Sequence, residues 1–257
     1  MILTHKLSWQ ERLWRILCPN RCLGCFRVLP PEQLFCKACQ KELPGEPISR
    51  DFLLPPDGEG RPWGQGRLSV LSPLSYRGSF HTTLYRMKFR GESSLAQPLG
   101  WVMADAAMSF HRSFQGVAYV PMSPAKLKRR GYNQSALLAK WVARELRLPC
   151  LDLLEQCRET ETQHGLARAQ RSDNVRGAYR GLDAAEGKDL LLVDDVVTTG
   201  ATLRSCAVAL YQAGARSVWG LCAMDAGGED VQAPFHLEEE EWSMFRKGGT
   251  TRDPSIF

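Results

Sequence analysis

A run of four apolar residues, Leu190 to Val193, ends in two adjacent aspartates, Asp194 and Asp195. A strand that is apolar at successive positions is buried on both faces, which is typical of the interior of a parallel sheet. In such sheets, ligands bind at the carboxyl ends of the strands. The stretch therefore predicts an α/β fold with functional carboxylates at one edge of its sheet.

The residues that follow predict a loop that binds a phosphate. Threonine hydroxyls surround Gly200, and the unpaired N–H groups of a helix N-terminus favour an anion there. The two carboxylates can instead accept hydrogen bonds from the 2′,3′-diol of a ribose, so a sugar phosphate would satisfy both halves. The alternative is that both aspartates only cap the helix. The candidate binding residues are Asp194, Asp195, Val196, Val197, Thr198, Thr199, Gly200, Ala201 and Thr202.

The rest of the chain alternates between strand and helix patterns, which predicts a parallel α/β sheet. Strands are expected at 67–76, 116–121, 189–195 and 215–225, and helices at 80–91, 93–112, 133–148 and 200–215. Proline and glycine are dense in residues 44–66, which favours a linker. The predicted division is an N-terminal helix and cysteine module (1–43), the linker (44–66), the α/β domain (67–225) and an acidic, disordered tail (226–257).

Five of the nine cysteines fall between positions 18 and 39. Two C-x-x-C pairs, Cys22 with Cys25 and Cys36 with Cys39, can present four thiolates to one metal ion. This spacing predicts a closed, structural zinc ribbon, and an iron–sulfur centre is the alternative. Cys18 is expected to lie outside the site.

Charge is distributed unevenly along the chain. The net charge is +5, but seven acidic and three basic residues follow from Ala226 onward, so residues 1–225 carry about +9. A body this basic favours anionic partners such as nucleotides, diphosphates or nucleic acid, and ordinary surface charge is the alternative. We expect a cytoplasmic protein without a stable membrane span, because charged residues interrupt the N-terminal apolar residues and no apolar run reaches about 18 residues.

The stretch LLLVDDVVTTGAT resembles the phosphoribosyl-pyrophosphate signature of type I phosphoribosyltransferases. Two upstream segments, VPMSPAKLKRRGYNQSALLA and RETETQHGLARAQRSDNVRGAY, extend the likeness. With the cysteine pairs in front, roughly residues 14–225 resemble the ComF family. One departure is Met122-Ser123, which stands where the family usually has a histidine.

The resemblance implies a type I phosphoribosyltransferase fold behind a zinc ribbon, and phosphoribosyl pyrophosphate with magnesium as ligand. Residues 121–131 would form a loop that holds pyrophosphate, with Arg130 among its binding residues. Arg171 would stabilise the leaving pyrophosphate, and Asp195 would also take part in catalysis.

Three functions stay open at this point. The resemblance implies the handling of single-stranded DNA during natural transformation, beside a helicase-like competence protein. The second is an active phosphoribosyltransferase that acts on an unknown base or amine. The third is a non-catalytic module that senses nucleotides or binds nucleic acid, because a fold alone does not decide function.

Overall fold

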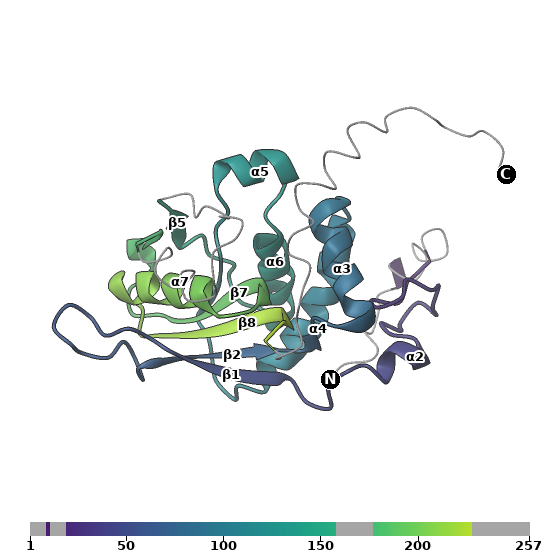
Figure 1. The fold of residues 1–257 in the computed structure, drawn as a ribbon, viewed down its shortest axis with the longest axis horizontal. Helices are drawn as coiled ribbons and strands as arrows, with labels where there is room; N and C mark the ends of the chain where they lie inside the picture. The colour runs from purple at the N-terminus through teal and green to yellow at the C-terminus, as the bar shows by residue number, and fades with distance from the viewer. Residues whose placement is uncertain (1–8, 11–18, 158–176, 228–257) are drawn as a thin grey trace.

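The computed structural model describes residues 9–10, 19–157 and 177–227 (Figure 1). Its main sheet has the order β1-β2-β8-β7-β4, and β3 also pairs with β8. β1 is antiparallel to β2, and all other pairs of this sheet are parallel. The strands are β1 (Ile48–Leu53), β2 (Arg67–Ser72), β3 (Leu74–Ser75), β4 (Gly116–Tyr119), β7 (Asp189–Val197) and β8 (Ser217–Asp225). The predicted α/β fold with a mostly parallel sheet is confirmed.

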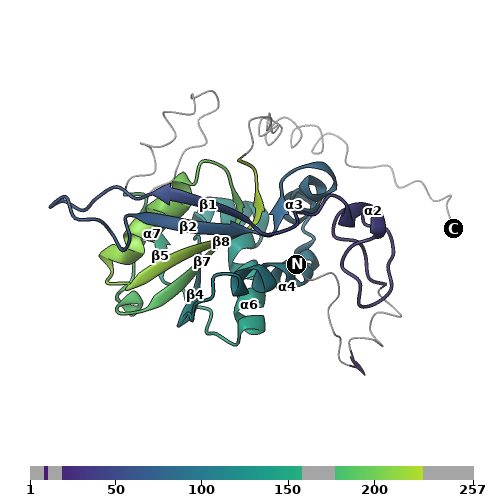
Figure 2. The ribbon, with the colours of Figure 1, turned by 90° about the horizontal axis from the view of Figure 1, so that it is seen from below.

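Helices cover both faces of the sheet. α4 (Ala96–Met108) and α6 (Gln134–Leu146) pack on one face. On the other face lie α7 (Ala201–Gln212) and a small antiparallel hairpin of β5 (Leu154–Gln156) and β6 (Tyr179–Gly181). The cysteine module, with α2 (Lys37–Gln40), and α3 (Gly78–Phe89) lie at one end of the sheet (Figure 2). Among the described residues there are also the short helices η1 (Ser93–Leu95), α5 (Pro124–Arg130) and η2 (Asp183–Ala185).

The strand β7 shows why consecutive apolar residues were needed. Leu191 and Val193 belong to the core under α4 and α6, whereas Leu190 and Leu192 belong to the core under α7. All four side chains are fully buried. Alternate side chains of a strand point to opposite faces, so a central strand with both faces covered requires apolar residues throughout.

The structure differs from the sequence-based expectation in two segments. Residues 48–53, within the expected linker, form the edge strand β1, which pairs along its whole length with β2. Residues 124–130, within the expected pyrophosphate loop, form helix α5. The Ser123 side chain accepts a hydrogen bond from the Lys126 backbone N–H, Pro124 occupies the first turn, and Gly131 ends the helix with a left-handed φ of 82°. These are ordinary start and stop signals for a helix.

The predicted division into 1–43, 44–66, 67–225 and 226–257 stays a prediction. Within the part of the chain that the structure describes, no helix has both the length and the apolar character that crossing a membrane requires. Cys18, Arg171 and the acidic tail beyond Gly227 lie outside the described residues.

Candidate functional site

The two aspartates lie at the carboxyl end of β7, as predicted. Asp194 accepts a hydrogen bond from the Ser135 hydroxyl at 2.7 Å and another from the backbone N–H of Asp195 at 2.9 Å. Burial, and next the negative charge of Asp195, raise the pKa of Asp194 to about 7. Burial disfavours the charged form of a carboxyl group, and a neighbouring like charge adds to the effect.

Asp195 makes an ion pair that the sequence did not predict. The Lys88 ammonium of α3 lies 3.1 Å from Asp195 Oδ1, and the two side chains are only 13% and 11% exposed. Little solvent therefore screens this pair. The pair places a cation beside the carboxylates at the end of β7.

The predicted phosphate loop joins β7 to α7. Gly200 caps α7 with a left-handed φ of 71°, and the Thr199 hydroxyl oxygen accepts a long hydrogen bond of 3.4 Å from the Ala201 N–H. A Cβ atom on Gly200 would lie 2.5 Å from the ring of Phe52 on β1. The glycine is therefore required by its backbone conformation and by the packing of Phe52, a reason that the sequence did not suggest.

Arg50 of β1 braces the same loop. Its guanidinium donates to the Thr198 carbonyl oxygen at 2.7 Å and lies 3.4 Å from a carboxylate oxygen of Asp225, at the end of β8. The backbone N–H of Ala226 also donates to the carbonyl of Val197 at 2.8 Å. The loop is thus tied on one side to an edge strand and on the other to β8.

The remaining predicted residues lie in β7 and α7, and at the end of α5. Val196 and Val197 complete β7, while Ala201 and Thr202 form the first turn of α7. Arg130, at the end of α5, donates to Gln134 Oε1 at 3.4 Å and lies over the ring of Phe89, 5.4 Å from its centroid. Gln134 is fully buried beside Ser135 at the start of α6, and its amide nitrogen has no hydrogen-bond partner among the residues that the structure describes. Asn133 caps α6, since its side chain accepts a hydrogen bond from the Ala136 N–H.

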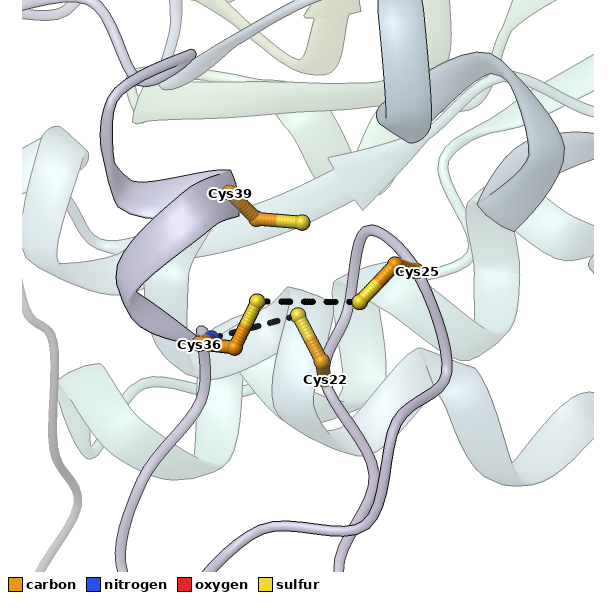
Figure 3. Close-up of side chains that lie close together, drawn as sticks. All are labelled: Cys22, Cys25, Cys36 and Cys39. Atoms are coloured by element: carbon orange, nitrogen blue, oxygen red, sulfur yellow. Dashed lines mark hydrogen bonds between the residues drawn. The ribbon is translucent and has the colours of Figure 1, made fainter.

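The four predicted metal ligands lie together (Figure 3). The Sγ atoms of Cys22, Cys25, Cys36 and Cys39 are all within 4.8 Å of one another, and only Cys25 is exposed. Tetrahedral zinc–thiolate geometry separates the sulfurs by about 3.8 Å, and Cys25 and Cys36 are 3.6 Å apart. Hydrogen bonding, chiefly with the backbone of Cys39, lowers the pKa of Cys36, whereas burial raises the pKa of Cys22 and Cys39. A bound cation would favour the thiolate form of all four side chains. The donor set therefore fits a structural metal ion, and zinc is compatible with it.

The cysteine module packs directly on α3. Phe35 of the module meets Phe80 of α3 edge to face, with ring centroids 5.8 Å apart. The Glu42 carboxylate accepts hydrogen bonds from the backbone N–H and the hydroxyl of Ser79, both at 3.0 Å. The Thr83 hydroxyl donates to the carbonyl of Leu23, between the first two cysteines.

Comparison with known proteins gives one domain match and several relatives. Residues 133–235 match the phosphoribosyl transferase domain. DNA utilization protein YhgH of Escherichia coli is 28% identical over 213 residues, which cover 78% of this chain and 89% of the relative. Competence protein F of Haemophilus influenzae is 31% identical over 150 residues, covering 54% of this chain and 65% of that protein. Competence protein ComFC of Bacillus subtilis is 29% identical over 149 residues, covering 56% and 58% respectively.

The resemblance to the ComF family is confirmed. In this chain, the position that departs from the family pattern has a structural role, because Ser123 is the buried cap of α5. Two site residues were missed from the sequence, Lys88 and Arg50. Lys88 lies in the last turn of a helix, where a lysine is ordinary, and Arg50 lies in a segment whose composition favours a linker. No local signal marked either residue.

Proposed function

We propose that this chain is a cytoplasmic ComF-type protein whose β7–α7 loop binds phosphoribosyl pyrophosphate with magnesium, and which handles single-stranded DNA during uptake. The junction of β7 and α7 is the main support for the proposed sugar-phosphate site. Two carboxylates lie near the carboxyl end of β7, and the loop held by Arg50 leads directly into the N-terminus of α7. A ligand with a diol and a phosphate could bind both features, the diol to the carboxylates and the phosphate to the helix N-terminus.

The four-cysteine cluster supports a structural zinc ion in this proposal. Its all-sulfur donor set has no open position for a substrate, as in structural sites. The phosphoribosyl transferase domain supports the choice of ligand, and the relatives named for competence and DNA utilization support the role with DNA. A helicase-like competence protein is the partner that this role implies.

The ligand is tested by thermal unfolding with phosphoribosyl pyrophosphate and magnesium. A ligand that binds only the folded state raises Tm, by an amount that corresponds to about 2.7 kcal/mol when its concentration is 100 times Kd. Asp195→Asn should lose most of this shift, because the amide accepts hydrogen bonds from the diol more weakly than a carboxylate does. Asp183→Asn, at an exposed aspartate in η2, is the matched control and should keep it. Equal shifts in the two variants would contradict the proposed diol contact.

A specific observation supports a path for DNA over α5. This helix projects from the body of the protein (Figure 1) and carries the exposed side chains of Lys128 and Arg129. Basic side chains bind the phosphates of single-stranded DNA with little sequence selectivity and with strong dependence on salt.

The DNA path is tested by titrating a fluorescent single-stranded oligonucleotide at several salt concentrations. The double variant Lys128→Ala/Arg129→Ala should bind more weakly, and the slope of log K against log salt should fall by roughly 0.7 for each phosphate that the variant no longer binds. Lys140→Ala/Arg144→Ala removes two exposed basic side chains from α6 and should bind as the wild type does. An equal weakening in both variants would mean that DNA binding follows net charge and not α5.

A further inference from the structure

Lys88 is a cation that the fold places beside the candidate diol-binding carboxylates. Its ammonium contacts Asp195 at 3.1 Å, and both side chains are nearly buried. Removing a lysine from water is unfavourable unless a partner compensates, so such a residue is rarely found without a specific contact. The contact with Asp195 accounts for one of the three hydrogens that the ammonium can donate.

The position of Lys88 is fixed by contacts at both ends of α3. At the start of the helix, Glu42 binds the N–H and hydroxyl of Ser79, and Phe35 packs on Phe80. At its end, the Tyr132 hydroxyl donates to the carbonyl of Met87, the residue before Lys88. These contacts hold the backbone from which the Lys88 side chain extends, so that less conformational freedom is lost when Lys88 binds a ligand.

The chemistry of the proposed ligand brings an anion to this position. In phosphoribosyl pyrophosphate the diphosphate is attached to C1, and C1 is bonded to the carbon that carries one of the two diol hydroxyls. If Asp195 accepts hydrogen bonds from the diol, the diphosphate lies within reach of a lysine that already contacts Asp195. A charge-assisted hydrogen bond between ammonium and phosphate is among the stronger polar contacts in proteins.

We propose that Lys88 is a specificity-determining residue that binds the diphosphate on C1, so that the site prefers phosphoribosyl pyrophosphate to ribose 5-phosphate. This inference rests on the proposed function, because it requires the diol at Asp195. Ribose 5-phosphate offers the same 5-phosphate and diol but has no charged group on C1. The two ligands therefore differ in the part that Lys88 would contact.

The experiment compares the affinities of the two ligands by calorimetry, at constant magnesium, for the wild type, Lys88→Met and Lys140→Met. Lys88→Met should bind phosphoribosyl pyrophosphate at least about tenfold more weakly and should bind ribose 5-phosphate within about twofold of the wild type. Lys140→Met, at an exposed lysine of α6, should bind both ligands unchanged. Unchanged binding of phosphoribosyl pyrophosphate to Lys88→Met, or an equal loss of affinity for both ligands, would overturn the inference.

A second measurement on the unaltered protein covers the case in which Lys88→Met does not fold. Acetylation of Lys88 by an amine-reactive reagent is followed by mass spectrometry at saturating concentrations of each ligand. Phosphoribosyl pyrophosphate should slow acetylation of Lys88 more than ribose 5-phosphate does, and Lys140 should react at the same rate throughout. Equal protection by the two ligands would refute a contact with the diphosphate. If the wild type binds neither ligand, the proposed function fails, and this inference fails with it.

Discussion

Asp194 and Asp195 are neighbours in the sequence but have different partners. Asp195 is paired with the Lys88 ammonium, whereas Asp194 accepts hydrogen bonds from a hydroxyl and a backbone N–H. Because burial and the charge of Asp195 raise the pKa of Asp194 to about 7, this side chain takes up a proton near neutral pH. The charge of Asp194 therefore depends on pH near neutrality.

The raised pKa of Asp194 predicts a pH dependence of stability. The folded state binds this proton more tightly than the unfolded state, so the free energy of unfolding should fall as pH rises from about 4 through 7. Between pH 5 and 8 the decrease should be on the order of 2 kcal/mol. Asp194→Asn cannot ionise and should lack this part of the dependence, as measured by urea unfolding at several pH values. Parallel pH profiles for the wild type and the variant would contradict the assignment.

Local pattern explains which site residues could be predicted. The aspartates and the loop come directly after a buried apolar run, so their place at the carboxyl ends of the strands follows from the sequence itself. Tertiary packing brings Lys88 and Arg50 to the site. Lys88 is 107 positions before its partner Asp195 in the sequence, and Arg50 is 148 positions before its partner Thr198. A single sequence contains no signal for such contacts, because each residue is ordinary in its own segment.

At the scale of elements, α3 connects the cysteine module to the site. Its first turns contact the module through Ser79, Phe80 and Thr83, and its last turn carries Lys88. The packing of the module on α3 should therefore fix the helix, and a disordered module should leave its first turns without partners.

Removal of the metal site is predicted to loosen α3 as well as the module. Cys36→Ser should abolish zinc binding by the cluster, and the backbone amides of α3 should exchange hydrogen faster, while those of β7 and β8 stay protected. Metal analysis and hydrogen exchange measured by mass spectrometry test this prediction. Cys157→Ser changes an exposed cysteine far from the cluster in sequence and should show neither effect. Full retention of zinc by Cys36→Ser would contradict the ligand assignment.

The missed elements show where sequence patterns compete. The signals for α5 were present in Ser123, Pro124 and Gly131, but the resemblance favoured a loop there. The signal for β1 was weak, because proline and glycine flank a strand of only six residues, and its partner β2 decides its structure. Tertiary pairing overrode composition in that segment.

At the scale of the whole molecule, we predict that the segment that matches the phosphoribosyl transferase domain does not fold on its own. Residues 133–235 lack β2, whose Val70 contacts β8 at Gly220, and they lack α4, which packs on α6. This fragment should show no cooperative thermal unfolding by circular dichroism, whereas the full chain should show a clear transition. A cooperative transition of the fragment near the Tm of the full chain would contradict the prediction.

The order of strands in the sheet also bears on how the protein forms during synthesis. β8 is the last strand of this sheet to leave the ribosome, yet it lies between β2 and β7. Until it emerges, both of those strands present an unpaired edge, and exposed strand edges promote aggregation. The nascent chain cannot complete the pairing of β2 and β7 with β8 before residue 225 is available. Its cellular yield should therefore depend on chaperones that protect strand edges during translation.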